Sequence, residues 1–215
     1  NTYAVCYTIS HEQMADGKYP QLVVARSKSL GRSMLQTKEN VCAMILNRAF
    51  NSSYTGWDGI ELGASNHVLS KGGTYANELP TPADLSERSL EQALNMIQRF
   101  TDDAGLKFSC RGMKLIIPVE SQQEACRILK SDLRYDTAEN ALNANKYMGA
   151  LPGGIVVSTY MTDTNAWFIK TSAEDGLKFW QREAMEISND TDFNSKNMRF
   201  SAMERDSAGW TDPRG

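Results

Sequence analysis

The stretch from Pro20 to Phe50 reads PQLVVARSKSLGRSMLQTKENVCAMILNRAF and decides the fold. Its apolar residues recur at helical spacing on one face, and Pro20 suits a first helical turn. At ~1.5 Å rise per residue this helix would run ~45 Å. A compact chain of this length has a radius of gyration of roughly 17 Å, which makes a sphere about 44 Å across. The stretch therefore predicts a spine helix, typical of a tile or strut. The alternative is a long core helix kinked at Gly31. The apolar stripe consists of Val23, Leu30, Met34, Val41 and Ile45.

Charge and composition exclude several classes of protein. The formal net charge of −3 argues against a dedicated nucleic-acid binder, which is usually strongly basic. The first fifty residues are mildly basic, which fits either a solvated helix face or an inner surface near phosphate. The chain has no apolar run long enough to span a bilayer and no signal peptide. It begins at Asn1 on an alternating strand, as expected if a preceding part had been removed. The four cysteines show no C-x-x-C spacing, so we expect free thiols in a reducing compartment.

Beyond the spine, the pattern is a mixture of helices and strands. A polar, glycine-rich connection runs from Asn51 to about Thr81, and its length indicates a function, a contact or a short strand around Ile60 and Leu62. Thr81-Pro82 is expected to open a helix whose stripe is Leu90, Leu94, Ile97 and Phe100. A buried strand follows at 115–118, and Ser121 with Glu124 predicts a capping box for the next helix. Further strands are expected at 155–157, 166–169, 177–182 and 198–202, with a solvated loop at 188–197. The fold class is α+β.

Two alternating strands lie at opposite ends of this sequence. Tyr3, Val5, Tyr7 and Ile9 alternate near the start, and Met198, Phe200 and Ala202 alternate near the end. Neither strand has a sequence neighbour that the pattern marks as a hairpin partner. We therefore expect both in one antiparallel sheet beneath the spine, since loop-closure entropy grows only logarithmically with length.

Few residues offer chemistry. His11 lies in HEQMA, which lacks the second histidine of H-E-x-x-H, and no phosphate-binding or nucleophile motif is present. His67 is expected to be a hydrogen-bonding loop residue, although a hydrolase using it with Cys110 or Ser65 stays open. Asp102-Asp103 is either a solvated helix end or a weak cation site. We expect no catalytic residue, no metal and no cofactor. Trp167 and Trp180 are expected to pack in the core.

The ordered set of motifs resembles the major capsid protein of tailed phages, particularly the Mu-like major head subunit group. The resemblance covers almost the whole chain from about Ser10. Compared with this family, we expect the amino-terminal arm and most of the extended loop to be missing. The motifs, in order, are KENVCAMILNRAF, GASNHVLSKGGTYANELPTPADLSERSLEQAL, KLIIPVESQQEACRILKSD, TDTNAWFIK, GLKFWQRE and GWTDPRG.

This resemblance implies a phage major capsid fold with a spine helix, a peripheral antiparallel sheet and a compact axial domain. Mapped here, the peripheral domain would be 1–79 plus 187–215, and the axial domain 80–186. The implied function is a structural subunit of an icosahedral head that encloses the packaged genome. Partners would be copies of itself in pentamers and hexamers, with portal, scaffolding or decoration proteins possible. No sequence-specific nucleic-acid binding and no membrane are expected. The protein would assemble in the host cytoplasm and reside in the virion.

One alternative to a phage head is an encapsulin-type nanocompartment, which shares this fold and would be favoured by a hydrophobic groove for a cargo peptide. The other is the hydrolase above. For a shell subunit, the residues of interest are those that meet neighbouring copies. The candidates are Arg26, Arg32, Arg48, Trp57, Trp210 and Arg214.

Overall fold

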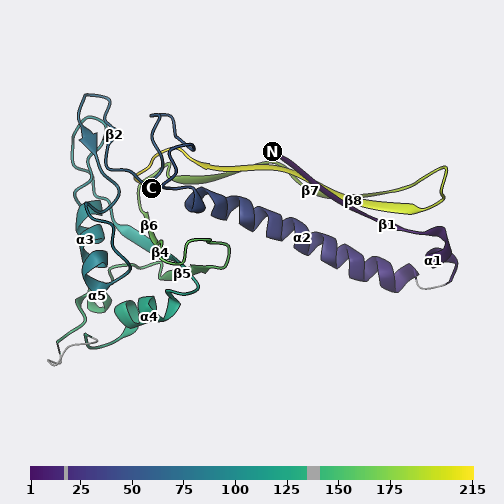
Figure 1. The fold of residues 1–215 in the computed structure, drawn as a ribbon, viewed down its shortest axis with the longest axis horizontal. Coiled ribbons are helices and arrows are strands. Elements are labelled where there is room, and N and C mark those ends of the chain that lie inside the picture. Colours follow the sequence, from purple (N-terminus) through teal and green to yellow (C-terminus); the bar gives the residue numbers. More distant parts are fainter. Residues whose placement is uncertain (17–18, 135–140) are drawn as a thin grey trace. The chain divides into compact units, whose positions relative to one another are not determined.

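The computed structural model describes residues 1–16, 19–134 and 141–215. Its elements confirm the α+β class (Figure 1). The helices are α1 (His11–Ala15), α2 (Tyr19–Asn47), α3 (Glu87–Ile97), α4 (Gln122–Lys130) and α5 (Ala144–Tyr147). The strands are β1 (Thr2–Ile9), β2 (His67–Val68), β3 (Thr74–Tyr75), β4 (Gly112–Pro118), β5 (Ile155–Ser158), β6 (Phe168–Thr171), β7 (Leu177–Thr191) and β8 (Met198–Trp210).

Contacts divide the chain into two compact units. The first, here called the sheet unit, comprises 1–42 and 179–209, and the second, the mixed unit, comprises 43–178 and 210–215. The boundaries expected for a peripheral and an axial domain, at residues 79 and 186, do not coincide with these units. The peripheral and axial division therefore stays a prediction.

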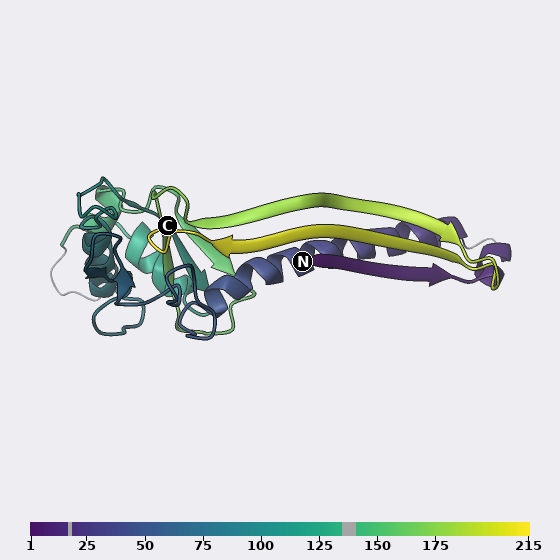
Figure 2. The same ribbon diagram turned by 90° about the horizontal axis from the view of Figure 1, so that it is seen from above.

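In the sheet unit, α2 lies along a three-stranded sheet of order β1-β8-β7 (Figure 2). β1 and β8 are antiparallel, with Tyr7 opposite Phe200. Leu30 and Met34 of α2 form a buried cluster with Ala202, against which Tyr3 and Tyr7 pack. This arrangement confirms the predicted spine helix and the predicted pairing of the two end strands beneath it. The helix ends at Asn47, three residues before Phe50.

The expectation that β8 has no hairpin partner was wrong. β7 runs for fifteen residues, well beyond the predicted 177–182, and pairs with β8 through the turn at 192–197. The expected loop at 188–197 is therefore strand up to Thr191. Almost every residue of β7 is exposed, so neither face shows the alternation that would have identified the strand.

In the mixed unit, the sheet order is β5-β4-β6, with β4 parallel to β5 and antiparallel to β6. Its main core includes Leu90 and Leu94 of α3 with Leu115 and Ile117 of β4. Ile97 and Phe100 are buried in a second cluster, so the predicted stripe of this helix is confirmed. The three expected strands here are present, although β6 begins at Phe168.

Two local predictions in the mixed unit were wrong, and one alternative for the glycine-rich connection does not occur. α3 begins at Glu87 rather than near Pro82, because Ser86 and Ser89 form a reciprocal capping box. Ser121 makes no side-chain cap bond to α4, since its ψ of 1° departs from the extended backbone that a capping side chain needs. Residues 60–62 form no strand. The connection instead carries the short β2-β3 pair, and Glu61 makes only an isolated bridge to Thr55.

Candidate subunit-contact surfaces

The three candidate arginines of the spine differ in what they already contact. Arg26 donates from Nη1 to the carbonyl of Thr8 at 2.9 Å, so it ties α2 to the end of β1. Arg48 lies over the ring of Tyr54, with its guanidinium carbon 4.1 Å from the centroid. Arg32 is exposed, and its side chain makes no hydrogen bond, ion pair or ring contact within the described part of the chain. Its guanidinium is therefore the most available of the three for a neighbouring molecule.

The two candidate tryptophans are placed differently. Trp57 is 68% exposed, which is unusual for so large an apolar side chain. Trp210 is half-buried, and its indole lies directly over Gly56, where a Cβ atom would come within 2.1 Å of the ring. Trp57 is thus displayed, whereas Trp210 packs within the mixed unit. The other two tryptophans were both expected in the core. Trp167 packs against the core as predicted, but Trp180 is 47% exposed, so the prediction for Trp180 was wrong.

Arg214 is the candidate that the structure leaves least accessible. It is only 7% exposed, and its guanidinium binds Asp103 at 2.5 Å and lies 3.6 Å from Asp212. The guanidinium also lies over the ring of Tyr75, 4.5 Å from the centroid. Burial raises the pKa of Tyr75, with the Arg214 charge opposing that shift. This engagement leaves little of Arg214 for another subunit.

His67 is fully buried and has partners on both ring nitrogens. Nδ1 lies 2.7 Å from Asp58 Oδ2, and Nε2 lies 3.3 Å from the carbonyl oxygen of Leu62. Its ring stacks on Tyr75 at 5.2 Å. These contacts hold the connection together, as expected for a hydrogen-bonding loop residue. They do not include Cys110 or Ser65, the partners that a hydrolase would need.

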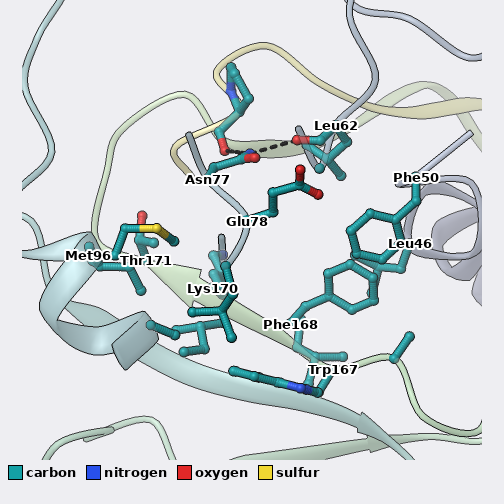
Figure 3. A pocket seen from close by; sticks show the side chains of 18 of the residues that line it. Leu46, Phe50, Leu62, Asn77, Glu78, Met96, Trp167, Phe168, Lys170 and Thr171 are labelled. Atoms are coloured by element: carbon teal, nitrogen blue, oxygen red, sulfur yellow. Dashed lines mark hydrogen bonds between the residues drawn. The ribbon is translucent and has the colours of Figure 1, made fainter. Parts of the chain in front are cut away.

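The mixed unit contains a pocket of about 610 Å³ with mostly apolar walls (Figure 3). The rings of Phe50 and Phe168 stack in its wall at 5.7 Å. Asn77 lies at the opposite side and donates to the carbonyls of Leu62 at 2.6 Å and Pro213 at 2.7 Å. Sequence reasoning missed Asn77, because a single amide in a polar loop carries no pattern. The size and lining of this pocket are those of a site for an apolar ligand.

The described residues offer no metal site and no membrane span. They contain no group of three His, Cys, Asp or Glu side chains arranged to hold a metal ion. None of the helices in the described ranges is both long and apolar enough to cross a bilayer. The cysteines are free: Cys6 and Cys126 are exposed, Cys42 is half-buried and Cys110 is buried.

Comparison with known proteins identifies the class. The model of a family described as phage capsid protein matches residues 1–215. No curated protein sequence matches the chain significantly. The chain belongs to the phage capsid protein family, and it is a structural subunit of a capsid shell.

Solved structures share the fold at low sequence identity. The virus-like particle from Pyrococcus furiosus is 14% identical, with a TM-score of 0.55 over 100% of this chain and 74% of that chain. The decorated capsid of bacteriophage JBD30 is 10% identical, with a TM-score of 0.56 over 75% of this chain and 74% of that chain. The capsid of Ralstonia phage GP4 is 12% identical, with a TM-score of 0.52 over 98% and 69%. This likeness confirms the predicted phage major capsid fold.

Proposed function

We propose that this subunit assembles with copies of itself, as pentamers and hexamers, into a closed icosahedral head around a phage genome. The observation that carries this proposal is the match of the capsid family over the whole chain. A shell reuses one set of contacts many times, so each contact can be modest while the assembled shell is stable. Exposed Arg32 and Trp57 are available for such contacts. Assembly would occur in the host cytoplasm, with portal, scaffolding or decoration proteins as further partners.

We also propose that the subunit is not an enzyme. Supporting this, both nitrogens of His67 are taken by Asp58 and Leu62. A thiol-reactive or serine-reactive activity probe should label the wild-type protein and the His67→Ala variant equally. Labelling of Cys110 or Ser65 that is abolished by His67→Ala would overturn this part of the proposal.

Assembly is tested by electron microscopy and light scattering of the purified protein at increasing concentration. Closed shells of uniform diameter are the expected result, and a soluble monomer at all concentrations would contradict it. The encapsulin-type alternative would add a cargo enzyme inside the shell. The apolar pocket does not favour it over a phage head, because no occupant is indicated. Mass spectrometry of purified shells separates the two, since nucleic acid and a packaged enzyme are readily distinguished.

A further inference from the structure

The inner face of β8 changes from apolar to acidic partway along the strand. Phe200 and Ala202 are 8% and 0% exposed and pack in the sheet unit. The next two residues on the same face are Glu204 and Asp206, which are 1% and 3% exposed. Side chains of a strand alternate between faces, so both carboxyl groups point to the side covered by α2. We call these two residues the acidic pair.

Within the described residues, only one carboxylate of the acidic pair has a side-chain cation beside it. Lys38 of α2 places Nζ 2.9 Å from Glu204 Oε2, and 25% of its side chain is exposed. The other oxygen of Glu204 and both carboxylate oxygens of Asp206 are buried without a hydrogen-bond partner among the described residues. The terminal ammonium of Asn1 comes close, but it donates to the backbone carbonyl of Asp206 at 2.8 Å.

Among the described residues, no side-chain cation forms an ion pair with Asp206. Cys42, one helical turn beyond Lys38, has its pKa raised by burial and then by the charges of Glu39 and Asp206. Arg205 pairs with Glu183 at 3.1 Å. If Lys38 moved to Asp206, Glu204 would be left alone. Two buried carboxylates therefore share one ammonium, and an unpaired buried carboxylate is strongly unfavourable.

We propose that a second copy of this chain supplies the missing cation, so that an Arg or Lys side chain from a neighbouring subunit completes the acidic pair on assembly. This inference rests on the proposed function. Charge complementarity supports it, because the pair lacks one positive charge while Arg32 is exposed and forms no ion pair or side-chain hydrogen bond in the described part of the chain. A metal ion is a poorer occupant, since the described residues offer no group of three suitable ligands.

The acidic pair lies close to the protein surface, next to partly exposed side chains. Lys38 is partly exposed, and the neighbouring ring of Phe179, 5.7 Å from its ammonium, is 42% exposed. A swing of the Lys38 side chain toward Asp206 would expose Glu204 to an incoming guanidinium or ammonium. Both carboxylates would then be paired, and each copy in a shell would donate one cation and accept one.

The test uses the full chain with two separate substitutions, Asp206→Asn and Glu204→Gln. Each removes one acid, so that Lys38 suffices and the neighbour's cation is no longer needed. We expect both variants to melt at the wild-type temperature or above. We expect each to need about tenfold more protein before shells appear, because a charge-assisted contact between copies is lost. The matched control is Glu186→Gln, which removes an exposed carboxylate of β7 that forms no ion pair within the described residues, and it should change neither property.

The assembly and melting results distinguish a failure of this inference from a failure of the proposed shell function. If either variant is folded and forms shells at the wild-type concentration, the pair is satisfied within one chain by a proton or water, and the inference is wrong. If the wild-type protein forms no shells, the proposed function fails and the inference fails with it. If both variants keep their melting temperature and need more protein to assemble while Glu186→Gln changes neither property, the inference holds.

Discussion

The rings of Tyr7 and Phe200 stack with their centroids 4.9 Å apart and their planes inclined by 12°. The two residues lie opposite each other in the antiparallel pairing of β1 and β8. This contact joins the first and last long strands of the chain and lies in the sheet on which α2 packs. It is the feature of the sheet unit that substitution can test most directly.

Phe200→Ala should lower the free energy of unfolding by about 3 to 5 kcal/mol, the usual cost of truncating a buried aromatic residue. Met203→Ala is the matched control, since Met203 lies on the same strand but is 45% exposed. The control should cost less than about 1 kcal/mol. Urea denaturation followed by circular dichroism measures both. In Phe200→Ala, hydrogen exchange should show lost protection in the sheet unit, and an equal loss through residues 80–178 of the mixed unit would argue against separate cores.

The spine and the end-strand pairing could be predicted because their burial is one-sided. Leu30 and Met34 are 4% and 1% exposed on one face of α2, and Phe200 and Ala202 are buried on one face of β8. A single buried face leaves a period in the sequence, 3.6 residues for the helix and two for the strand. β7 buries neither face well, so its fifteen residues left no period to read.

Helix starts were less predictable because several residues compete for the role. Pro82 was expected to open α3, yet the backbone turns helical only after Ser86, whose hydroxyl accepts from the N–H of Ser89 at 3.1 Å. Ser121 has the spacing of a capping box but not the extended backbone. The acidic pair could not be predicted from the sequence pattern either. Alternation along β8 places Glu204 and Asp206 on the buried face, but acidic side chains are rarely buried.

A second prediction concerns the contact between Gly56 and Trp210. Gly56→Ala would place a methyl group within 2.1 Å of the indole, so the ring must move out of its packed position. Overpacking of this kind costs about 1 to 3 kcal/mol. Gly31→Ala is the matched control, because the helix leaves open space at that Cβ position. That change should stabilise the protein by up to about 1 kcal/mol through helix propensity. Equal effects of the two substitutions on the melting temperature would contradict the packing argument.

A third prediction orders the cysteines by reactivity. Cys6 and Cys126 are exposed, whereas Cys110 is 2% exposed. Burial and the nearby charges of Glu39 and Asp206 raise the pKa of Cys42, so less of its thiol is ionised at a given pH. Iodoacetamide at pH 8 should therefore modify Cys6 and Cys126 first, Cys42 more slowly and Cys110 last, as followed by peptide mass spectrometry. Cys42 reacting as fast as Cys126 would contradict this order. Titration in denaturant without reductant should find all four thiols.

The last prediction separates contact between copies from folding. Arg32→Glu reverses an exposed charge on α2 that forms no ion pair or side-chain hydrogen bond within the described residues, so the free energy of unfolding should change by no more than about 0.5 kcal/mol. In a shell the same change occurs at every copy, and like-charge contacts would repeat around it. We expect shells to appear only at about tenfold higher protein concentration or above. Arg88→Glu, an equal reversal at an exposed position of α3, is the control and should assemble nearly as the wild type does. Light scattering measures assembly, and thermal denaturation of the unassembled subunit measures stability. A loss of assembly that is matched by an equal fall in melting temperature would mean that Arg32 supports the fold, and its role as a subunit contact would be rejected.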